Sequence, residues 1–144
     1  MTAAPRIATA EDAEVITRLL RAFFSHEGAV VRHLRQNVEA ILDDPGRGFF
    51  TIAGDAAVAT TTIRISARGG ASAEIEEIWV QPSARGRGIG SRLLASAVGE
   101  CRRRGIESIE LRVTPDDLEV GIPDFYVKQG FRHRGRQIMH FEGE

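Results

Sequence analysis

The sequence has a single cysteine, almost no net charge and no long apolar run, and each shortage excludes a class of protein. Cys101 alone cannot form an internal disulfide, and no group of cysteine and histidine residues has the spacing of a zinc site. A formal charge of -1 gives no overall attraction to nucleic acid or to an anionic membrane. The apolar runs are too short to span a bilayer, and the first residues lack the apolar core of a signal peptide. We therefore expect a cytoplasmic protein that binds no metal, no nucleic acid and no membrane.

The spacing of apolar residues predicts one α/β domain over residues 1–144. Thr9 is typical of a helix N-cap, and Val31 is expected to open the apolar stripe of the second helix. A strand, a helix and a strand in succession near the middle of the chain predict a parallel crossover, so the sheet should be mixed. The expected order is β-αα-βββ-α-β-α-β, with strands at 6–8, 49–53, 58–66, 73–80, 106–113 and 131–141, and later helices at 88–104 and 124–129.

A loop rich in glycine and arginine separates the strand that ends at Val80 from the helix that follows. The first turn of a helix has four N–H groups without helical partners and a partial positive charge, and glycine removes the side chains that would keep an anion away. The loop therefore predicts an anion site, although a tight turn with solvated arginines also explains it. No lysine follows Gly88 as a P-loop requires, and Ser91 stands where a dinucleotide fingerprint needs its last glycine.

Residues 85–90 match the pattern [Q/R]-x-x-G-x-[G/A], and Phe125-Tyr126 and Gly130-Phe131 follow later in the chain. Together these motifs resemble the GNAT superfamily of acetyl-CoA-dependent N-acetyltransferases, nearest in style to its small-amine and polyamine members. The resemblance implies a GNAT fold, with a mixed central sheet flanked by helices and splayed between the fourth and fifth strands. Acetyl-CoA would lie in the splay, with its pyrophosphate on the loop amides. The implied coenzyme-binding residues are Ile78, Trp79, Val80, Arg85, Gly86, Arg87, Gly88, Ile89, Gly90, Ser91 and Tyr126.

Transfer of an acyl group to an amine calls for a general base, because a lysine-like amine with a pKa of about 10.4 is almost fully protonated at neutral pH. Glu76 and Glu77 lie in an otherwise apolar strand before the loop, and alternation along the strand should turn only one of them into a given cleft. A solvated strand face also explains both. The resemblance favours Glu76 over Glu77, with Glu74 a weaker third, and implies that Tyr126 protonates the departing thiolate.

The acceptor is expected to be an amine on a small molecule or a peptide. By resemblance, the first two helices and their connection line its pocket, so Phe24 and Glu27 would form an aromatic and acidic lining for a cationic amine. An ordinary helix end explains these two residues equally well. The loop at 114–123 lacks the asparagine that family members often carry, so we assign it no coenzyme contact. The expected reaction is direct transfer in a ternary complex, and a non-catalytic acyl-CoA sensor is the alternative; an exposed final strand would suit a homodimer.

Overall fold

The computed structural model describes residues 3–112, 122–132 and 139–143, which group into one unit ending at Arg112 and a second unit after it. The first unit is built from strands and helices that alternate in the order expected from the sequence, and the second contains one described helix, α5 (Ile122–Lys128). The elements of the first unit are β1 (Arg6–Ile7), α1 (Ala13–Glu27), α2 (Leu34–Leu42), β2 (Gly48–Ala53), β3 (Ala57–Ser66), β4 (Gly70–Val80), α3 (Ile89–Arg103) and β5 (Ser108–Leu111).

The strands of the first unit form one sheet in the order β1-β2-β3-β4-β5. The pairs from β1 to β4 are antiparallel, whereas β5 follows α3 and runs parallel to β4. The β4–β5 pairing ends where Ile75 faces Leu111, so among the described residues the stretch from Glu76 to Val80 has no partner on β5. The predicted mixed sheet is confirmed, whereas its opening between the fourth and fifth strands stays a prediction, because residues 113–121 lie outside the described residues.

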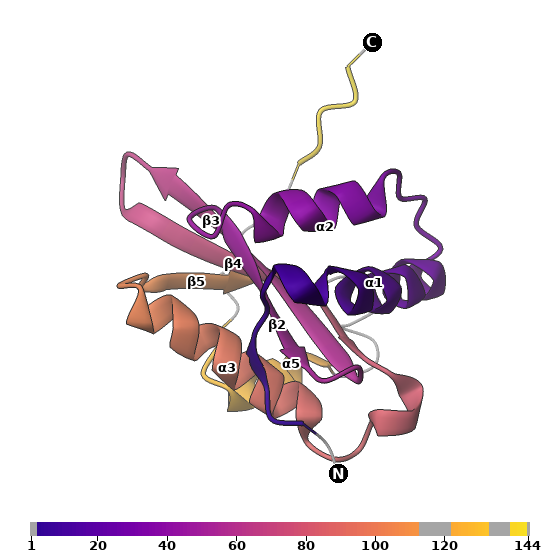
Figure 1. The fold of residues 1–144 in the computed structure, drawn as a ribbon. Helices are drawn as coiled ribbons and strands as arrows, with labels where there is room; N and C mark the ends of the chain where they lie inside the picture. Colours follow the sequence, from indigo (N-terminus) through magenta and orange to yellow (C-terminus); the bar gives the residue numbers. More distant parts are fainter. Residues whose placement is uncertain (1–2, 113–121, 133–138, 144) are drawn as a thin grey trace. The chain divides into compact units, whose positions relative to one another are not determined.

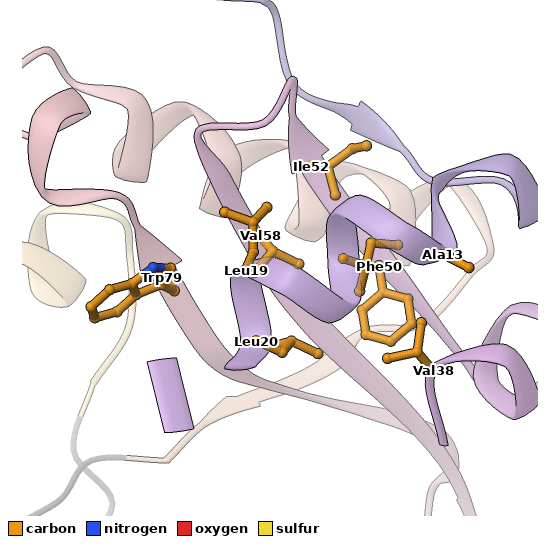
Figure 2. Packing of buried hydrophobic residues seen from close by; sticks show 9 residues of the cluster. Ala13, Leu19, Leu20, Val38, Phe50, Ile52, Val58 and Trp79 are labelled. Atoms are coloured by element: carbon orange, nitrogen blue, oxygen red, sulfur yellow. The ribbon is translucent and has the colours of Figure 1, made fainter. Parts of the chain in front are cut away.

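Helices cover both faces of this sheet (Figure 1). On one face, α1 and α2 bury a cluster of apolar side chains against β2, β3 and β4, with Leu19 and Phe50 fully buried near its middle and Trp79 at its margin (Figure 2). On the other face, α3 contacts β2, β3 and β4. Its buried residues are Ile89, Leu93, Leu94, Ala97 and Cys101. Each large side chain buried in this way stabilises the fold by about 1.5–3 kcal/mol.

A β-bulge in β4 breaks the alternation that the sequence predicts for this strand. Thr60 faces Glu76 and Val58 faces Trp79, so one residue of β3 lies opposite two residues of β4. Glu77 lies at the bulge and has a φ of 47°, a left-handed conformation that is uncommon for a residue with a side chain. Because Val58 and Thr60 lie two apart on β3, their partners Trp79 and Glu76 lie on the same face of the sheet, the face covered by α1 and α2.

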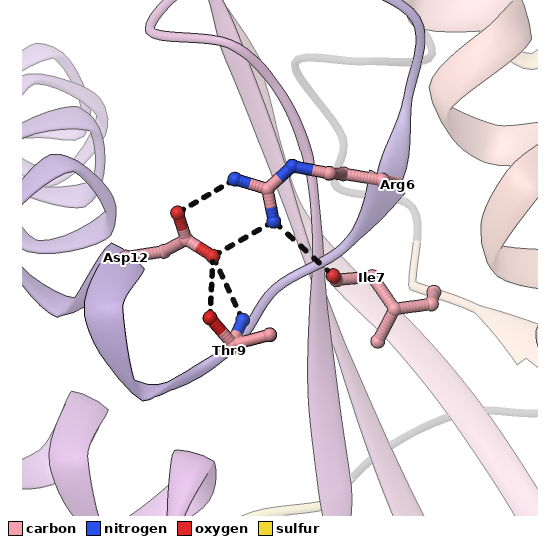
Figure 3. A network of polar contacts seen from close by, with 4 residues as sticks. All are labelled: Arg6, Ile7, Thr9 and Asp12. Atoms are coloured by element: carbon pink, nitrogen blue, oxygen red, sulfur yellow. Dashed lines mark hydrogen bonds and ion pairs between the residues drawn. The ribbon is translucent and has the colours of Figure 1, made fainter.

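A network of charged and polar groups holds the start of α1 (Figure 3). A short 3-10 turn from Ala10 to Asp12 precedes the helix, and the Asp12 carboxylate accepts a hydrogen bond of 2.8 Å from the Thr9 N–H. The same carboxylate accepts two hydrogen bonds from the Arg6 guanidinium, at 2.7 and 2.9 Å. The hydrogen bonds from Arg6 are the main cause that lowers the pKa of Asp12.

Two expectations from the sequence need correction. Val31 does not belong to the second helix: α2 begins at Leu34, after His33 adopts a left-handed φ of 57°, and Val31 is an exposed part of the connection. The final strand expected at 131–141 is not found in its described parts, since residues 131–132 and 139–141 are not in a strand. Its middle, residues 133–138, lies outside the described residues, as does most of the loop at 114–123.

We expect Asp12→Asn to lower the free energy of unfolding at neutral pH by about 1 kcal/mol, because it removes the charge that Arg6 and the Thr9 N–H both bind. Since the pKa of Asp12 is lowered in the folded state, its stabilisation is present above the unfolded pKa and is lost as the pH falls through the folded one. The loss on mutation should therefore shrink in acid. Urea unfolding at neutral and acidic pH measures both values. Glu14→Gln, an exposed change in the same helical turn, serves as control and should stay within about 0.5 kcal/mol of the parent.

Candidate functional site

The start of α3 carries the glycines that the sequence singles out. Gly88 is its N-cap with a φ of 75°, and Gly86 has a φ of 81°, so both positions favour glycine for conformational reasons. A Cβ atom built on either residue would meet no other atom within 4 Å, and no side chain caps the helix. The N–H groups of the first turn of α3 are therefore open to an anion, at the positive end of a 15-residue helix.

The two arginines of the loop take different positions. Arg85 turns back onto the end of β4, where its guanidinium lies 4.7 Å from the centre of the Trp79 ring and its Nε donates a hydrogen bond of 2.9 Å to the Val80 carbonyl. Arg87 is exposed and lines a hollow of about 600 Å³ beside the turn between β2 and β3. Stacking of Arg85 on an aromatic ring is a tertiary contact, so the sequence motif gave no sign of it.

Glu76 and Glu77 lie side by side on β4 at the bulge, in different surroundings. The Thr62 hydroxyl donates a hydrogen bond of 3.2 Å to Glu76, and burial followed by the charge of Glu74 raises the pKa of Glu76. Glu77 is more deeply buried, and its Oε2 atom has no hydrogen-bond partner among the described residues. Burial and then the charge of Glu76 raise the pKa of Glu77 to about 7. A carboxyl with such a pKa can both accept and release a proton near neutral pH.

Glu74, the third acidic residue on this strand, is held by arginines. Its carboxylate forms ion pairs with Arg112 at 3.0 Å and with Arg64 at 3.5 Å. Both ion pairs engage the Glu74 carboxylate within the protein, so its oxygens already have cationic partners. Cys101 is also excluded as a nucleophile, because burial raises the pKa of its thiol to about 11 and the thiolate is scarce at neutral pH.

Aromatic side chains of α1 surround Trp79. Its ring lies 5.8 Å from the ring of Phe23 and 5.4 Å from that of His26, and Phe23 in turn lies 5.3 Å from Phe24. The predicted acceptor residue Phe24 lines a hollow of about 590 Å³ beneath the connection between α1 and α2. Glu27, its predicted acidic companion, is exposed and does not line this hollow.

Tyr126 lies on α5 in the second unit, next to Phe125 in sequence, with the two rings 5.4 Å apart and edge to face. The helix ends where Gly130 adopts a φ of 100° and the Phe131 N–H donates a hydrogen bond of 3.1 Å to the Tyr126 carbonyl. The Phe-Tyr and Gly-Phe motifs are thus the body and the end of one short helix, because glycine readily takes the left-handed conformation that closes it.

Comparison with known proteins decides the family, since residues 13–131 match the Acetyltransferase (GNAT) family. The chain belongs to the GNAT family. Within this GNAT chain, 98 residues are 31% identical to glucosamine 6-phosphate N-acetyltransferase 1 of rice, a match over 68% of the chain and 54% of the relative. A stretch of 62 residues is 40% identical to an uncharacterized N-acetyltransferase of Methanocaldococcus jannaschii, over 43% of the chain and 26% of that relative. The matches thus span about half or less of these relatives' lengths.

Solved structures share the GNAT fold. An acetyltransferase structure from Arthrobacter superposes with a TM-score of 0.80 at 27% identity, over 97% of this chain and 94% of that one. A Clostridium acetobutylicum acetyltransferase, whose structure was solved with acetyl-CoA, gives a TM-score of 0.77 at 19% identity, over 98% and 96% of the two chains. Within the described part of this chain, no helix is long and apolar enough to cross a membrane, and no three His, Cys, Asp or Glu residues gather as a metal site would need.

The raised pKa of Glu77 predicts a measurable effect on stability. In the folded protein this carboxyl keeps its proton up to about pH 7, whereas in the unfolded chain it ionises near the ordinary value of 4.5. Between these values the folded state binds more protons, so the contribution of Glu77 to the free energy of unfolding falls as the pH rises. Glu77→Gln cannot ionise at this position. We therefore expect the free energy of unfolding of the variant, relative to that of the parent, to increase by on the order of 2 kcal/mol from about pH 5 to about pH 8. Denaturant unfolding at both pH values measures this difference.

Glu100→Gln is the matched control. A hydrogen bond from Arg103 is the main cause that lowers the pKa of Glu100 to about 2, so this carboxylate stays ionised at both pH values. The control can change stability, but by the same amount at each pH. A Glu77→Gln variant that behaves in the same way would contradict the assignment of a buried, protonated carboxyl to Glu77.

Proposed function

We propose that this chain transfers the acetyl group of acetyl-CoA to a primary amine by direct attack in a ternary complex. The amine nitrogen forms the new bond to the acetyl carbon, the carbon–sulfur bond breaks, and coenzyme A leaves as the thiol. The observation that carries the proposal is the uncapped N-terminus of α3, which follows within a few residues of the end of β4. An anion site so close to the end of a strand suits a thioester on a long phosphorylated arm.

The coenzyme would be held by the loop from Arg85 to Ser91. We assign its pyrophosphate to the N–H groups of Ile89, Gly90 and Ser91, supported by the positive end of α3 and the open space before Gly86 and Gly88. Arg87 is exposed and free to add charge, while Arg85 supports the site indirectly through its stacking on Trp79. The pantetheine arm would follow β4 from Ile78 to Val80, where no described residue of β5 pairs with the strand.

The Glu76–Glu77 pair is assigned to accept the proton of the amine. Resemblance to small-amine acetyltransferases favours Glu76, and its position on the face shared with Trp79 supports it. Burial, an oxygen without a described partner and a pKa of about 7 support Glu77. Tyr126 is assigned to donate a proton to the leaving thiolate. The rice relative acts, by its name, on an amino sugar phosphate, which supports a small-molecule amine as acceptor, and the homodimer stays a prediction for light scattering to check.

We expect Gly88→Ala to weaken coenzyme A binding at least about tenfold, because a methyl group at a φ of 75° strains the backbone and intrudes on the anion site. Isothermal titration calorimetry measures the dissociation constant. Gly99→Ala is the matched control, since Gly99 lies inside the same helix with free space around it. That change should stabilise α3 by about 0.5–1 kcal/mol and leave coenzyme binding unchanged. Equal affinity in the two variants would contradict the anion site.

We expect Tyr126→Phe to lower kcat by about 10²- to 10⁴-fold, and we expect the same of either Glu76→Gln or Glu77→Gln, whichever removes the base. Release of coenzyme A with a panel of amines measures kcat. The base is identified by the variant whose pH profile of kcat/KM loses its rising limb, since that limb reports the base of the free enzyme. If Glu76→Gln, Glu77→Gln and Tyr126→Phe all keep the parent kcat and profile, the assignments are wrong. If coenzyme A binds but no amine releases it, the chain is the non-catalytic acyl-CoA sensor.

A further inference from the structure

The hollow beneath the connection between α1 and α2 has a cationic rim and an apolar floor. Its volume is about 590 Å³, and Arg21, His33 and Arg35 contribute the basic groups. Phe24 and Leu34 are among the apolar side chains that line it. None of the nine described residues around the hollow is Asp or Glu, so its electrostatic character is of one sign.

Arg21 and Arg35 have few internal contacts that would compete with a ligand. Among the described residues, Arg21 forms no ion pair. Arg35 lies 3.5 Å from Glu39, but both side chains are about half exposed, at 51% and 50%, and an exposed pair of this kind adds little stability. A ligand anion can therefore recruit both guanidinium groups without breaking a strong internal contact.

The third basic residue of the rim, His33, has a left-handed backbone conformation that hydrogen bonds from Asn37 support. His33 has a φ of 57°, and Glu77 at the bulge is the one other non-glycine residue with a positive φ among the described residues. The Asn37 side chain donates a hydrogen bond of 3.0 Å to the Arg32 carbonyl, and the Asn37 N–H donates one of 2.9 Å to the His33 carbonyl. A glycine at this position would avoid the strain, and strained non-glycine residues concentrate at binding sites.

Aromatic contacts connect the hollow to the proposed reaction centre. Phe24 lines the hollow and touches Phe23, and Phe23 touches Trp79, with ring centres 5.3 and 5.8 Å apart. Trp79 lies on the same face of the sheet as Glu76. The hollow is thus two ring contacts away from Trp79, so an acceptor that reaches from the hollow to Glu76 is an extended molecule.

We propose that this hollow binds an anionic group, a phosphate ester or a carboxylate, on the amine that accepts the acetyl group. The inference rests on the proposed function and names its substrate class: an acceptor with an amine at one end and an anion at the other. It replaces the acidic lining expected around Glu27, which does not line the hollow. Charge-assisted hydrogen bonds from paired guanidinium groups are the geometry that favours such anions.

The first experiment compares amines that differ only in the anion. Glucosamine is paired with glucosamine 6-phosphate, and 1-aminohexane is compared with 6-aminohexyl phosphate and with 7-aminoheptanoic acid, so that phosphate and carboxylate are tested separately on a chain that can span the two ring contacts. We expect kcat/KM to be at least about tenfold higher for one class of anionic amine than for its neutral partner, as charged hydrogen bonds imply. The preference should fall as salt is added.

The second experiment locates the preference in the protein. Arg21→Gln and Arg35→Gln should each reduce the ratio of anionic to neutral kcat/KM by about tenfold, mainly through KM, and the double variant should reduce it further. Arg18→Gln, an exposed change on α1 outside the hollow, is the control and should keep the parent ratio. His33→Gly should lower the ratio while leaving the Tm unchanged or higher, since glycine accepts the left-handed backbone.

Calorimetry with the same amines, in the presence of coenzyme A, separates this inference from the proposed function. Binding of an anionic amine that weakens in Arg21→Gln and Arg35→Gln supports the hollow even if no acetyl group is transferred, and only the proposed function then fails. Acetylation of neutral and anionic amines at equal rates overturns the inference and leaves the proposed function intact. A preference for anions that survives in the double variant also overturns it.

Discussion

The bulge of β4 is the constraint on which the candidate site depends. A regular strand would put Glu76 and Trp79 on opposite faces, because they lie three residues apart. The extra residue at Glu77 brings them to the same face and turns the strand where its pairing with β5 has ended. A left-handed glutamate costs on the order of 1 kcal/mol, and the conformation persists because the β3 ladder continues on both sides of it. One local irregularity thus brings Glu76 and Trp79 to the same face of the sheet, with Glu77 between them in the strand.

Regular features of this fold could be predicted from the sequence, and irregular ones could not. The buried stripe of α3 repeats at helical spacing and the meander is marked by turns, so local patterns determine both. Glycine usually occupies left-handed positions, but Glu77 and His33 stand at these two, so neither left-handed residue has a signature in the sequence. The stacking of Arg85 on Trp79 bridges one turn, and the residues that line the cationic hollow all lie between Arg21 and Gln36. Such contacts depend on how side chains pack in the folded protein, and the spacing of apolar residues in the sequence does not predict them.

Arg85 connects the two halves of the site through Trp79. The same indole ring contacts Arg85 from the coenzyme loop and both Phe23 and His26 from α1. Trp79 does not itself line the hollow between α1 and α2, but it touches Phe23, which touches Phe24 at the hollow, so ring contacts lead from Arg85 to that hollow.

Separated charges would orient an amine acceptor in the proposed site. The acidic pair would accept the proton of the amine and the basic rim with Arg21 would bind the anion, so a molecule with opposite charges at its two ends would have one favourable orientation. An ammonium group next to a buried carboxyl favours the carboxylate, whereas apolar surroundings favour the neutral forms of both groups. Burial of Glu77, which raises the pKa of that carboxyl to about 7, acts in the second direction.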